Sequence, residues 1–397
     1  MPATAGTLAG LDQIHAEAIG WRRTLHQNPQ TAFEETFASE FIAARLTEWG
    51  IPVHRGLATT GVVGTLEGTG TAGGELESIG LRADIDALDI TEENDFEYRS
   101  QIPGKMHACG HDGHTTMLLA AAKYLSQNRN FGGRVQFIFQ PAEENEAGGR
   151  VMVDEGLFDL FPVDAVFGMH NWPGLEIGEF AVAPGPMMAS CDIFEITITG
   201  SGSHAAMPHH SVDPVVAAAH VVTALQTIAS RNVNPLERVV LSVTQVHAGD
   251  TWNVIPGTAV LRGTVRTFSE EVQNMAEAGI TRIATNVCAA LGGSAKVWYD
   301  RRYPATVNTE QETEWAAETA TRLAGADRVC RTPEPCMGSE DFAWMLKKRP
   351  GNYIWMGNGA DSTVVHHPRY DFNDDAIPWG ASYWVGLVES LLPASTK

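Results

Sequence analysis

Residues 106–114 concentrate side chains that can bind a transition metal. The segment reads Met-His-Ala-Cys-Gly-His-Asp-Gly-His, so three imidazoles and one thiol fall within it. On an extended backbone, His107, Cys109 and His111 would share one face, whereas in a helix only the two histidines would. Imidazole and thiolate suit zinc and similar ions. The segment therefore predicts metal binding at the start of a helix, which we expect Asp112 to cap.

Further candidate donors stand directly after other predicted strands. Strands and helices alternate in the first half of the chain, which predicts a largely parallel α/β sheet. Ligands of such sheets bind at the carboxyl ends of the strands. Five donors are too many for one closed tetrahedral site, so the set predicts two ions that share a bridge. The candidates are Cys109, His111, Glu144, His170 and His366, with His107, Asp84 and Asp86 in reserve.

The adjacent carboxylates Glu143 and Glu144 can divide two roles between them. One can bind a metal ion, while its neighbour takes a proton from a metal-bound water and later gives it to a leaving amine. The alternative is a solvated acidic turn, which the nearby Glu146 favours. The position of the pair, directly after a buried strand and Pro141, favours the site.

Three polar residues in the middle of the chain are weaker candidates. His204 lies in a loop of small residues, 200–208, where it can donate a hydrogen bond to a developing oxyanion. Asn253 and Arg266 stand near predicted strand ends, and the Arg266 guanidinium matches a carboxylate in shape and charge. By residue type alone, a position facing solvent explains all three residues equally well or better.

The predicted elements divide the chain into two domains. We expect residues 1–187 and 303–397 to form one α/β domain with a mostly parallel sheet. In its first part, strands at 61–66 and 78–83 flank a Gly-rich segment, 68–74, that we interpret as a hairpin. We expect residues 188–302 to form an inserted domain, because their strands and helices follow the βαββαβ order of the ferredoxin-like sandwich.

Composition excludes several classes of partner. The 397 residues suffice for two domains, and the net charge of −21 argues against nucleic acid and anionic membranes. No apolar run is long enough to span a membrane, and no basic segment precedes an apolar one at the N-terminus, so we expect no signal peptide. Five cysteines do not suggest a disulfide framework, and we therefore expect a cytoplasmic protein.

Ten motifs, spread over nearly the whole length, resemble those of the metal-dependent amidohydrolases of the aminoacylase/carboxypeptidase superfamily. The resemblance is strongest to the subgroup with hippurate hydrolase, N-acyl-L-amino acid amidohydrolase, N-acetyldiaminopimelate deacetylase and the plant indole-acetyl-amino-acid hydrolases. The motifs are His26-Gln-Asn-Pro-Gln, Leu81-Arg-Ala-Asp-Ile-Asp-Ala-Leu, Met106-His-Ala-Cys-Gly-His-Asp-Gly-His, Phe139-Gln-Pro-Ala-Glu-Glu, Gly168-Met-His-Asn, Gly202-Ser-His-Ala-Ala-Met-Pro, Trp252-Asn-Val-Ile-Pro, Gly263-Thr-Val-Arg-Thr-Phe, Met337-Gly-Ser-Glu-Asp-Phe and His366-His-Pro-Arg-Tyr-Asp-Phe-Asn-Asp.

The resemblance implies a zinc-exopeptidase-like catalytic domain that binds two divalent metal ions per subunit, Zn²⁺ or Mn²⁺, with Co²⁺ or Ni²⁺ as further candidates. It implies the ligands Cys109, His111, Glu144, His170 and His366, with Cys109 as the bridge. Glu143 would be the general base and acid, and Asp86 would support the metal.

The inserted domain would be a lid or dimerisation domain. The resemblance implies that His204 polarises the scissile carbonyl in the active site of the partner subunit, so we expect a homodimer or tetramer. Asn253, Arg266, Gly338 and Ser339 would bind the substrate, the last three by holding its carboxylate. Asp89 departs from the family, in which a proline usually follows Ala-Leu.

The implied reaction cleaves an N-acyl amino acid, of hippurate or N-acetyl type, to a carboxylic acid and a free amino acid. One alternative is a dipeptidase or carboxypeptidase of the same superfamily. A second is a metal-free hydrolase with Cys109 as its nucleophile. A third is a protein that binds metal or amino acids without catalysis.

Overall fold

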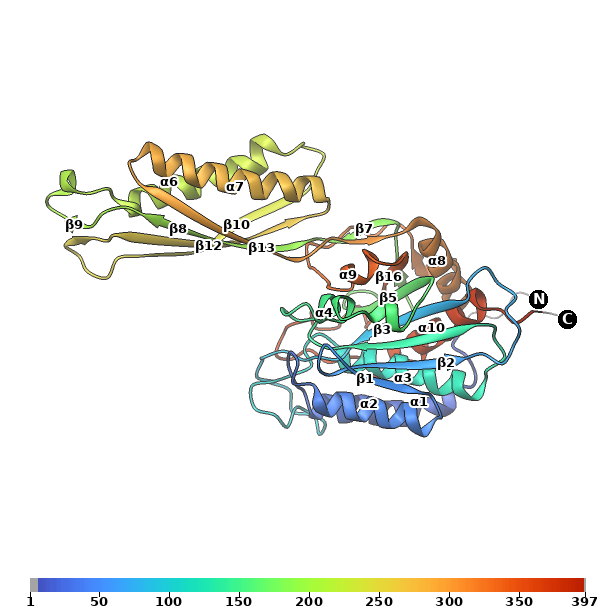
Figure 1. The fold of residues 1–397 in the computed structure, drawn as a ribbon. Helices are drawn as coiled ribbons and strands as arrows, with labels where there is room; N and C mark the ends of the chain where they lie inside the picture. The colour runs from blue at the N-terminus through green and yellow to red at the C-terminus, as the bar shows by residue number, and fades with distance from the viewer. Residues whose placement is uncertain (1–5, 396–397) are drawn as a thin grey trace. The chain divides into compact units, whose positions relative to one another are not determined.

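The structure, a computed structural model, describes residues 6–395, which form two compact units (Figure 1). Within the described chain, the first unit comprises the residues up to Met187, Val307–Glu334 and the residues from Asp341 onward, and the second comprises Met188–Thr306 and Pro335–Glu340. The limits expected from the sequence, 1–187, 188–302 and 303–397, stay a prediction about domain organisation.

An eight-stranded sheet forms the centre of the first unit. Its strands, in spatial order, are β1 (Val53–Leu57), β2 (Gly61–Glu67), β4 (Arg134–Gln140), β3 (Ser78–Asp84), β5 (Ala165–Trp172), β16 (Gly351–Gly357), β6 (Phe180–Ala181) and β15 (Val329–Cys330). The four central strands, β4, β3, β5 and β16, run parallel, while β1, β2 and β6 pair antiparallel to their inner neighbours. Both β3 and β16 are buried along their whole length, as strands covered on both faces are. The α/β prediction with a mostly parallel sheet is confirmed.

The Gly-rich segment 68–74 does not form a hairpin, so that prediction was wrong. β4 lies between β2 and β3 and pairs with both, antiparallel to β2 and parallel to β3. The segment instead runs beside Phe131, whose carbonyl accepts the amide of Gly70, and a Cβ on Gly68 would lie 1.9 Å from that oxygen. The connection between β2 and β3 is long enough to pass across β4. The fully buried β3 can therefore lie in the middle of the sheet.

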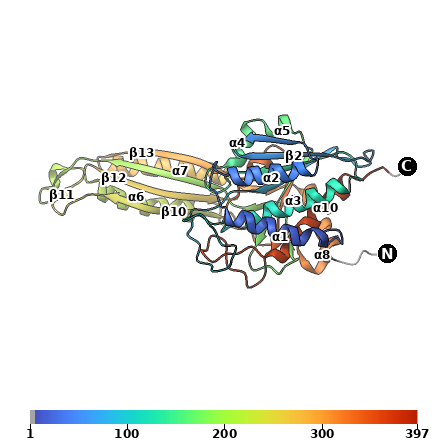
Figure 2. The same cartoon turned by 90° about the horizontal axis from the view of Figure 1, so that it is seen from below.

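Helix α3 (His111–Gln127) packs between α1 (Asp12–Gln27) and α10 (Ile377–Leu391) and against the sheet (Figures 1 and 2). Its segment 117–122, Met-Leu-Leu-Ala-Ala-Ala, is almost completely buried, and the three alanines let neighbouring elements approach closely. The other helices of this unit are α2 (Thr36–Glu48), α4 (Gly148–Asp154), α5 (Leu157–Leu160), α8 (Glu310–Ala324) and α9 (Ala343–Leu346). None of the described helices is long and apolar enough to cross a membrane.

The second unit has the expected βαββαβ order. Its elements are β8 (Cys191–Thr199), α6 (Pro214–Thr227), β10 (Val239–Ala248), β12 (Thr258–Thr267), α7 (Glu270–Ala290) and β13 (Ser294–Tyr303). The antiparallel sheet has the order β10-β12-β8-β13, as in a ferredoxin-like sandwich. Alternate residues of β8 (Phe194, Ile196, Ile198) are buried in the core that this unit shares with α6 and α7.

Short elements that the sequence did not predict complete the description. β9 (Ser203–His204) and β11 (Val254–Ile255) form a separate two-stranded ribbon, in which Val254 pairs with His204. β7 (Gly185–Met188) and β14 (Thr306–Asn308) form another. Helix α6 is followed directly by a π-helical turn, Ile228–Asn232.

Candidate metal and catalytic site

The first unit brings the five expected metal ligands into one cluster. The donor atoms of Cys109, His111 and His170 lie within 4.8 Å of one another, and so do those of Cys109, Glu144 and His366. Cys109 therefore belongs to both groups. The donors come from the start of α3, the segment after β4, the end of β5 and the loop after β16, which are neighbouring positions at the carboxyl edge of the parallel strands.

Hydrogen bonds fix which nitrogen each buried imidazole offers to the cluster. The Nδ1 of His111 lies 3.0 Å from the backbone oxygen of Asp86 and 3.1 Å from its carboxylate, so it donates there. Its Nε2 is buried and makes no hydrogen bond. The Nδ1 of His170 donates to the backbone oxygen of Asn171 at 2.6 Å, and its Nε2 lies 3.4 Å from the sulfur of Cys109. Both rings thus direct Nε2 toward the cluster, as metal-binding histidines do.

Glu144 and His366 complete the second group of donors. The Nε2 of His366 lies 3.0 Å from the Oε1 of Glu144, and this oxygen is buried without a hydrogen bond. The His366 amide donates to the backbone oxygen of Ala108 at 2.7 Å, which ties its loop to the segment of Cys109. His366 has φ of 64°, a left-handed conformation that histidine adopts more readily than most residues.

These residues fit two divalent cations. Thiolate, imidazole and carboxylate are the ligands of zinc and related metals, and one thiolate shared by two donor groups can bridge two ions. Burial, and then Glu144 and Glu143, raise the pKa of the Cys109 thiol well above its usual range, so a cation is needed to hold it as a thiolate. Burial lowers the pKa of His111, but the carboxylates of Asp84, Asp86 and Glu144 together outweigh it and raise that pKa to about 10. A metal ion would replace this proton.

Asp86 connects the metal ligands to the Glu143–Glu144 segment. Its Oδ2 accepts the backbone amide of Glu144 at 2.8 Å, while its Oδ1 faces His111. Glu143 is 7% exposed, and its carboxylate lies within 4.8 Å of the donor atoms of Glu144 and His111. Asp86 thus positions two candidate ligands, and Glu143 lies at the edge of the cluster.

The reserve donor Asp84 is occupied by His114, which supports the site from behind the ligands. The Nδ1 of His114 lies 2.6 Å from Asp84, and its Nε2 accepts the Asn171 amide at 2.9 Å. Asp84 also accepts a hydrogen bond from Arg82 at 2.8 Å. Burial raises the pKa of Asp84, but the positive charges of His111 and Arg82 hold it well below the usual range. His107 is buried and belongs to none of the potential metal-binding groups in the described chain.

Asp112 does not cap α3, contrary to the prediction. The helix begins at His111 after Gly110, which has φ of 92° and provides no side-chain cap. Asp112 instead lies in the first turn, where its Oδ2 is 2.8 Å from the Nδ1 of His26. Gly110 is required here, because a Cβ would lie 2.5 Å from the side-chain nitrogen of Asn171.

Sequence reasoning missed two groups of supporting residues. The Nδ2 of Asn171 donates to the backbone oxygen of Cys109 at 2.7 Å, and Tyr370 donates to the Asn171 side chain at 2.6 Å. Arg82 also forms an ion pair of 3.0 Å with Asp341. The available signal was that all four residues lie inside the ten motifs, Asn171 and Tyr370 in the same motifs as His170 and His366.

The second unit carries the other expected residues in two separate places. Exposed His204 lies on the ribbon of β9 and β11, and exposed Asn253 directly precedes β11, where its backbone oxygen accepts the Ala205 amide at 2.9 Å. Near the opposite end of β12, the Nη1 of Arg266 donates to the hydroxyl of Ser339 at 2.8 Å. Gly338 adjoins Ser339, and its carbonyl accepts the Ala189 amide at 2.9 Å. The structure therefore unites Arg266, Gly338 and Ser339, but not His204 and Asn253 with them.

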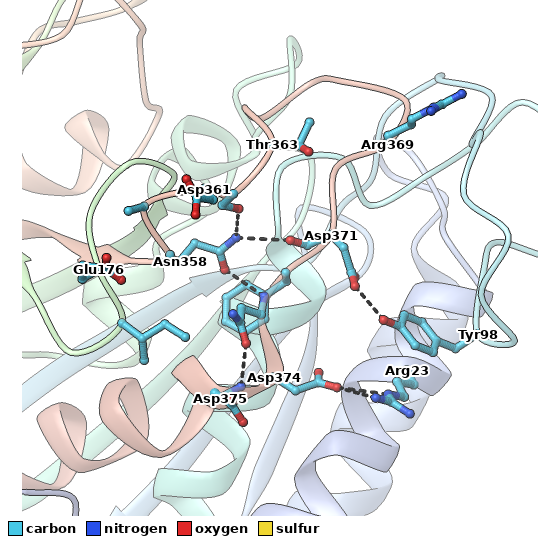
Figure 3. Close-up of a pocket in the computed structure, with 16 residues that line it drawn as sticks. Arg23, Tyr98, Glu176, Asn358, Asp361, Thr363, Arg369, Asp371, Asp374 and Asp375 are labelled. Atoms are coloured by element: carbon cyan, nitrogen blue, oxygen red, sulfur yellow. Dashed lines mark hydrogen bonds and ion pairs between the residues drawn. The ribbon is translucent and has the colours of Figure 1, made fainter.

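A polar cavity of about 740 Å³ lies beside the loop 358–375 (Figure 3). Arg23 pairs with Asp374 at its margin, and Tyr98 donates to Asp371 at 2.6 Å. None of the five expected ligands is among the described residues that line it. This cavity therefore does not replace the Cys109 cluster as the candidate site.

Comparisons with known proteins agree with this arrangement. The model of Peptidase family M20/M25/M40 matches residues 80–390. N-acetylcysteine deacetylase of Bacillus subtilis (strain 168) is 39% identical over 382 residues, which cover 96% of this chain and 98% of that protein. Hippurate hydrolase of Campylobacter jejuni is 37% identical over 366 residues, with 92% and 94% covered. The crystal structure of the YXEP protein of Bacillus subtilis, a dinuclear metal binding peptidase from the M20 family, superimposes with a TM-score of 0.84 at 35% identity, covering 97% of this chain and 100% of that one.

Proposed function

The chain belongs to peptidase family M20/M25/M40, and we propose that it hydrolyses the amide bond of N-acyl amino acids, with two bound divalent metal ions, to a carboxylic acid and a free amino acid. The observation that carries this proposal is the thiol of Cys109, shared by two groups of donor atoms beside the carboxylate of Glu143. Relatives named for N-acetylcysteine and hippurate hydrolysis support the substrate class.

In this proposal, His111 and His170 would hold one ion, Glu144 and His366 would hold the other, and Cys109 belongs to both donor groups. When bound, divalent ions would supply activation of a water molecule and polarisation of the amide carbonyl. Zn²⁺ and Mn²⁺ are our first candidates, and Co²⁺ or Ni²⁺ also suit this mixed set of donors.

Glu143 moves the protons of the reaction. It accepts a proton from the attacking water, and it then gives this proton to the nitrogen of the leaving amino acid. Asp86 supports this step from behind, because it holds the backbone of Glu144 and the ring of His111. We assign Asp86 a positioning role rather than contact with the substrate.

The residues of the second unit bind and polarise the substrate in this proposal. The Arg266 guanidinium, with Ser339 and Gly338 beside it, suits the carboxylate of the amino acid product. His204 donates to the carbonyl oxygen of the scissile amide, and Asn253, which directly precedes β11, lies beside it in the fold. We propose that the protein forms a homodimer or tetramer in which His204 serves the active site of the partner subunit.

We further propose that the protein works in the cytoplasm. All five cysteines are unpaired. A reducing compartment keeps a thiol such as Cys109 available to metal ions.

The test is a hydrolysis screen of the metal-reconstituted enzyme against hippurate, N-acetyl amino acids, indole-acetyl amino acids and dipeptides. We expect turnover of N-acyl amino acids that chelation abolishes and divalent metal restores. Turnover of dipeptides alone would favour a peptidase of the same superfamily. Full activity in metal-free protein would favour Cys109 as a nucleophile, and no hydrolysis across the panel would refute the proposal.

A further inference from the structure

A buried carboxylate outside the ligand cluster holds three separate segments of the first unit. Glu35, at the start of α2, is completely buried. Its Oε1 accepts the backbone amides of Phe33 at 3.1 Å and Ala142 at 3.0 Å. Its Oε2 accepts the hydroxyl of Thr60 at 2.6 Å. One side chain thus joins the loop before α2, the turn between β1 and β2, and the segment after β4.

Each of these segments contains a residue in the left-handed region. Phe33 has φ of 62°, Thr59 has φ of 70° and Ala142 has φ of 54°. For a residue with a Cβ, this conformation is strained, so neighbouring contacts must hold it in place. Glu35 supplies such a contact to Phe33 and Ala142 directly, and to Thr59 through its neighbour Thr60.

The segment held at Ala142 carries the proposed catalytic base. The residues on both sides of Glu143 are held by buried carboxylates. Glu35 accepts the backbone amide of Ala142, and Asp86 accepts that of Glu144. The backbone of the segment is closed further by the amide of Gly148, which donates to the Ala142 carbonyl at 2.9 Å. The direction of the Glu143 side chain therefore depends on the hydrogen bonds that hold the backbone before and after it.

We propose that Glu35 is a positioning residue for catalysis, which sets the conformation of residues 141–147 so that Glu143 points at the cluster and Glu144 reaches its donor group. This inference rests on the proposed role of Glu143. It assigns Glu35 no contact with the substrate.

The chemistry of the site specifies which substitution can replace Glu35. An alanine would leave the buried Ala142 amide, the partly buried Phe33 amide and the Thr60 hydroxyl without their acceptor, which is unfavourable. A glutamine keeps an oxygen toward the amides of Phe33 and Ala142, and its amide group can donate to the Thr60 hydroxyl, which also accepts. Burial raises the pKa of Glu35 to about 7, so assays at pH 8 compare these variants with the ionised wild-type side chain.

The experiment compares Glu35→Ala and Glu35→Gln with Glu155→Ala as a matched control. Glu155 also holds the turn between β1 and β2, since its Oε2 accepts the Ala58 amide at 2.6 Å, and this hydrogen bond does not involve the segment after β4. Two readouts are measured on the full-length protein: kcat and KM with saturating Mn²⁺, and hydrogen exchange of residues 141–147 with and without Mn²⁺.

We expect Glu35→Ala to lower kcat by about tenfold or more with a smaller change in KM, and to speed exchange in residues 141–147 by a similar factor. Glu35→Gln should restore both values to within about threefold of wild type, and Glu155→Ala should leave both there, since neither change loosens Ala142. Unchanged exchange in Glu35→Ala, or an equal loss of kcat in Glu155→Ala, would overturn the proposal. If the wild-type enzyme hydrolyses no N-acyl amino acid, the proposed function fails, whereas the exchange comparison still decides whether Glu35 holds the segment.

Discussion

Replacing Glu143 by Gln tests the proposed mechanism most directly. The substitution keeps the size of the side chain but removes its ability to accept a proton. Glu143 is not one of the five proposed ligands, and the neighbouring amides of Ala142 and Glu144 are held through the backbone. We therefore expect the variant to fold and to bind both metal ions as the wild type does.

The expected loss of activity follows from the two proton transfers assigned to Glu143. A positioned general acid or base contributes about 10²–10⁴-fold to a rate. With both transfers removed, kcat should fall by about 10³–10⁴-fold, which corresponds to about 4–5 kcal/mol of transition-state stabilisation. KM should change much less, because the metal ions and the second unit contribute most of the binding in this proposal.

The assay follows the release of the free amino acid from hippurate, with the metal content of the same preparations measured by elemental analysis. Glu146→Gln is the matched control, since Glu146 lies in the same turn but is exposed. A kcat within tenfold of wild type, in a Glu143→Gln protein that retains its metal, would refute the assignment. Loss of metal in this variant would instead make Glu143 a ligand.

Three further predictions concern the bridge, the second unit and pH. Cys109→Ala should lower the metal content from about two ions per subunit to one or fewer, because both donor groups lose the same sulfur; elemental analysis checks this. Mixing the His204→Ala and Glu143→Gln proteins should restore part of the wild-type activity, because a heterodimer has one site with an intact Glu143 and an intact His204 from the partner subunit. A mixture that stays inactive would contradict a role of His204 across subunits. Burial lowers the pKa of His26, but hydrogen bonds and charge from Asp112 and Glu92 raise it to about 9. This pKa is higher than that of a histidine in the unfolded chain. The stabilisation by protonated His26 is therefore complete below about pH 6.5 and is lost as the pH rises through 9. Urea unfolding should show that the difference in free energy of unfolding between wild type and His26→Gln shrinks by about 3 kcal/mol over that range. A constant difference would refute this role of His26.

The sequence was a good guide where chemistry follows strand ends. Cys109, Glu144 and His170 were expected together because the carboxyl ends of parallel strands meet at one edge of a sheet, and the structure brings their donor atoms together. The hairpin expected at 68–74 was wrong because strand pairing over a long sequence distance decides where β3 lies. β4 enters between β2 and β3, which no local pattern around the segment 68–74 reveals.

The residues that support the expected ligands could not be predicted from local sequence patterns either. Asp112 looks like a helix cap in sequence, yet its partner is His26, far away in the chain. Glu35 lies in a polar loop before α2, and nothing in that loop indicates that its carboxylate accepts the amide of Ala142. Such hydrogen bonds depend on which loops the sheet order places side by side.

The pairing of β16 with β5 has a consequence for the newly made chain. Tyr353 of β16 lies opposite Gly168 of β5, and the whole of Met188–Thr306 stands between them in sequence. During synthesis, the second unit leaves the ribosome with all its strands and helices while the central sheet still lacks β16. His366 is made later still, so the expected ligand set is complete only after the chain beyond β16 has been made.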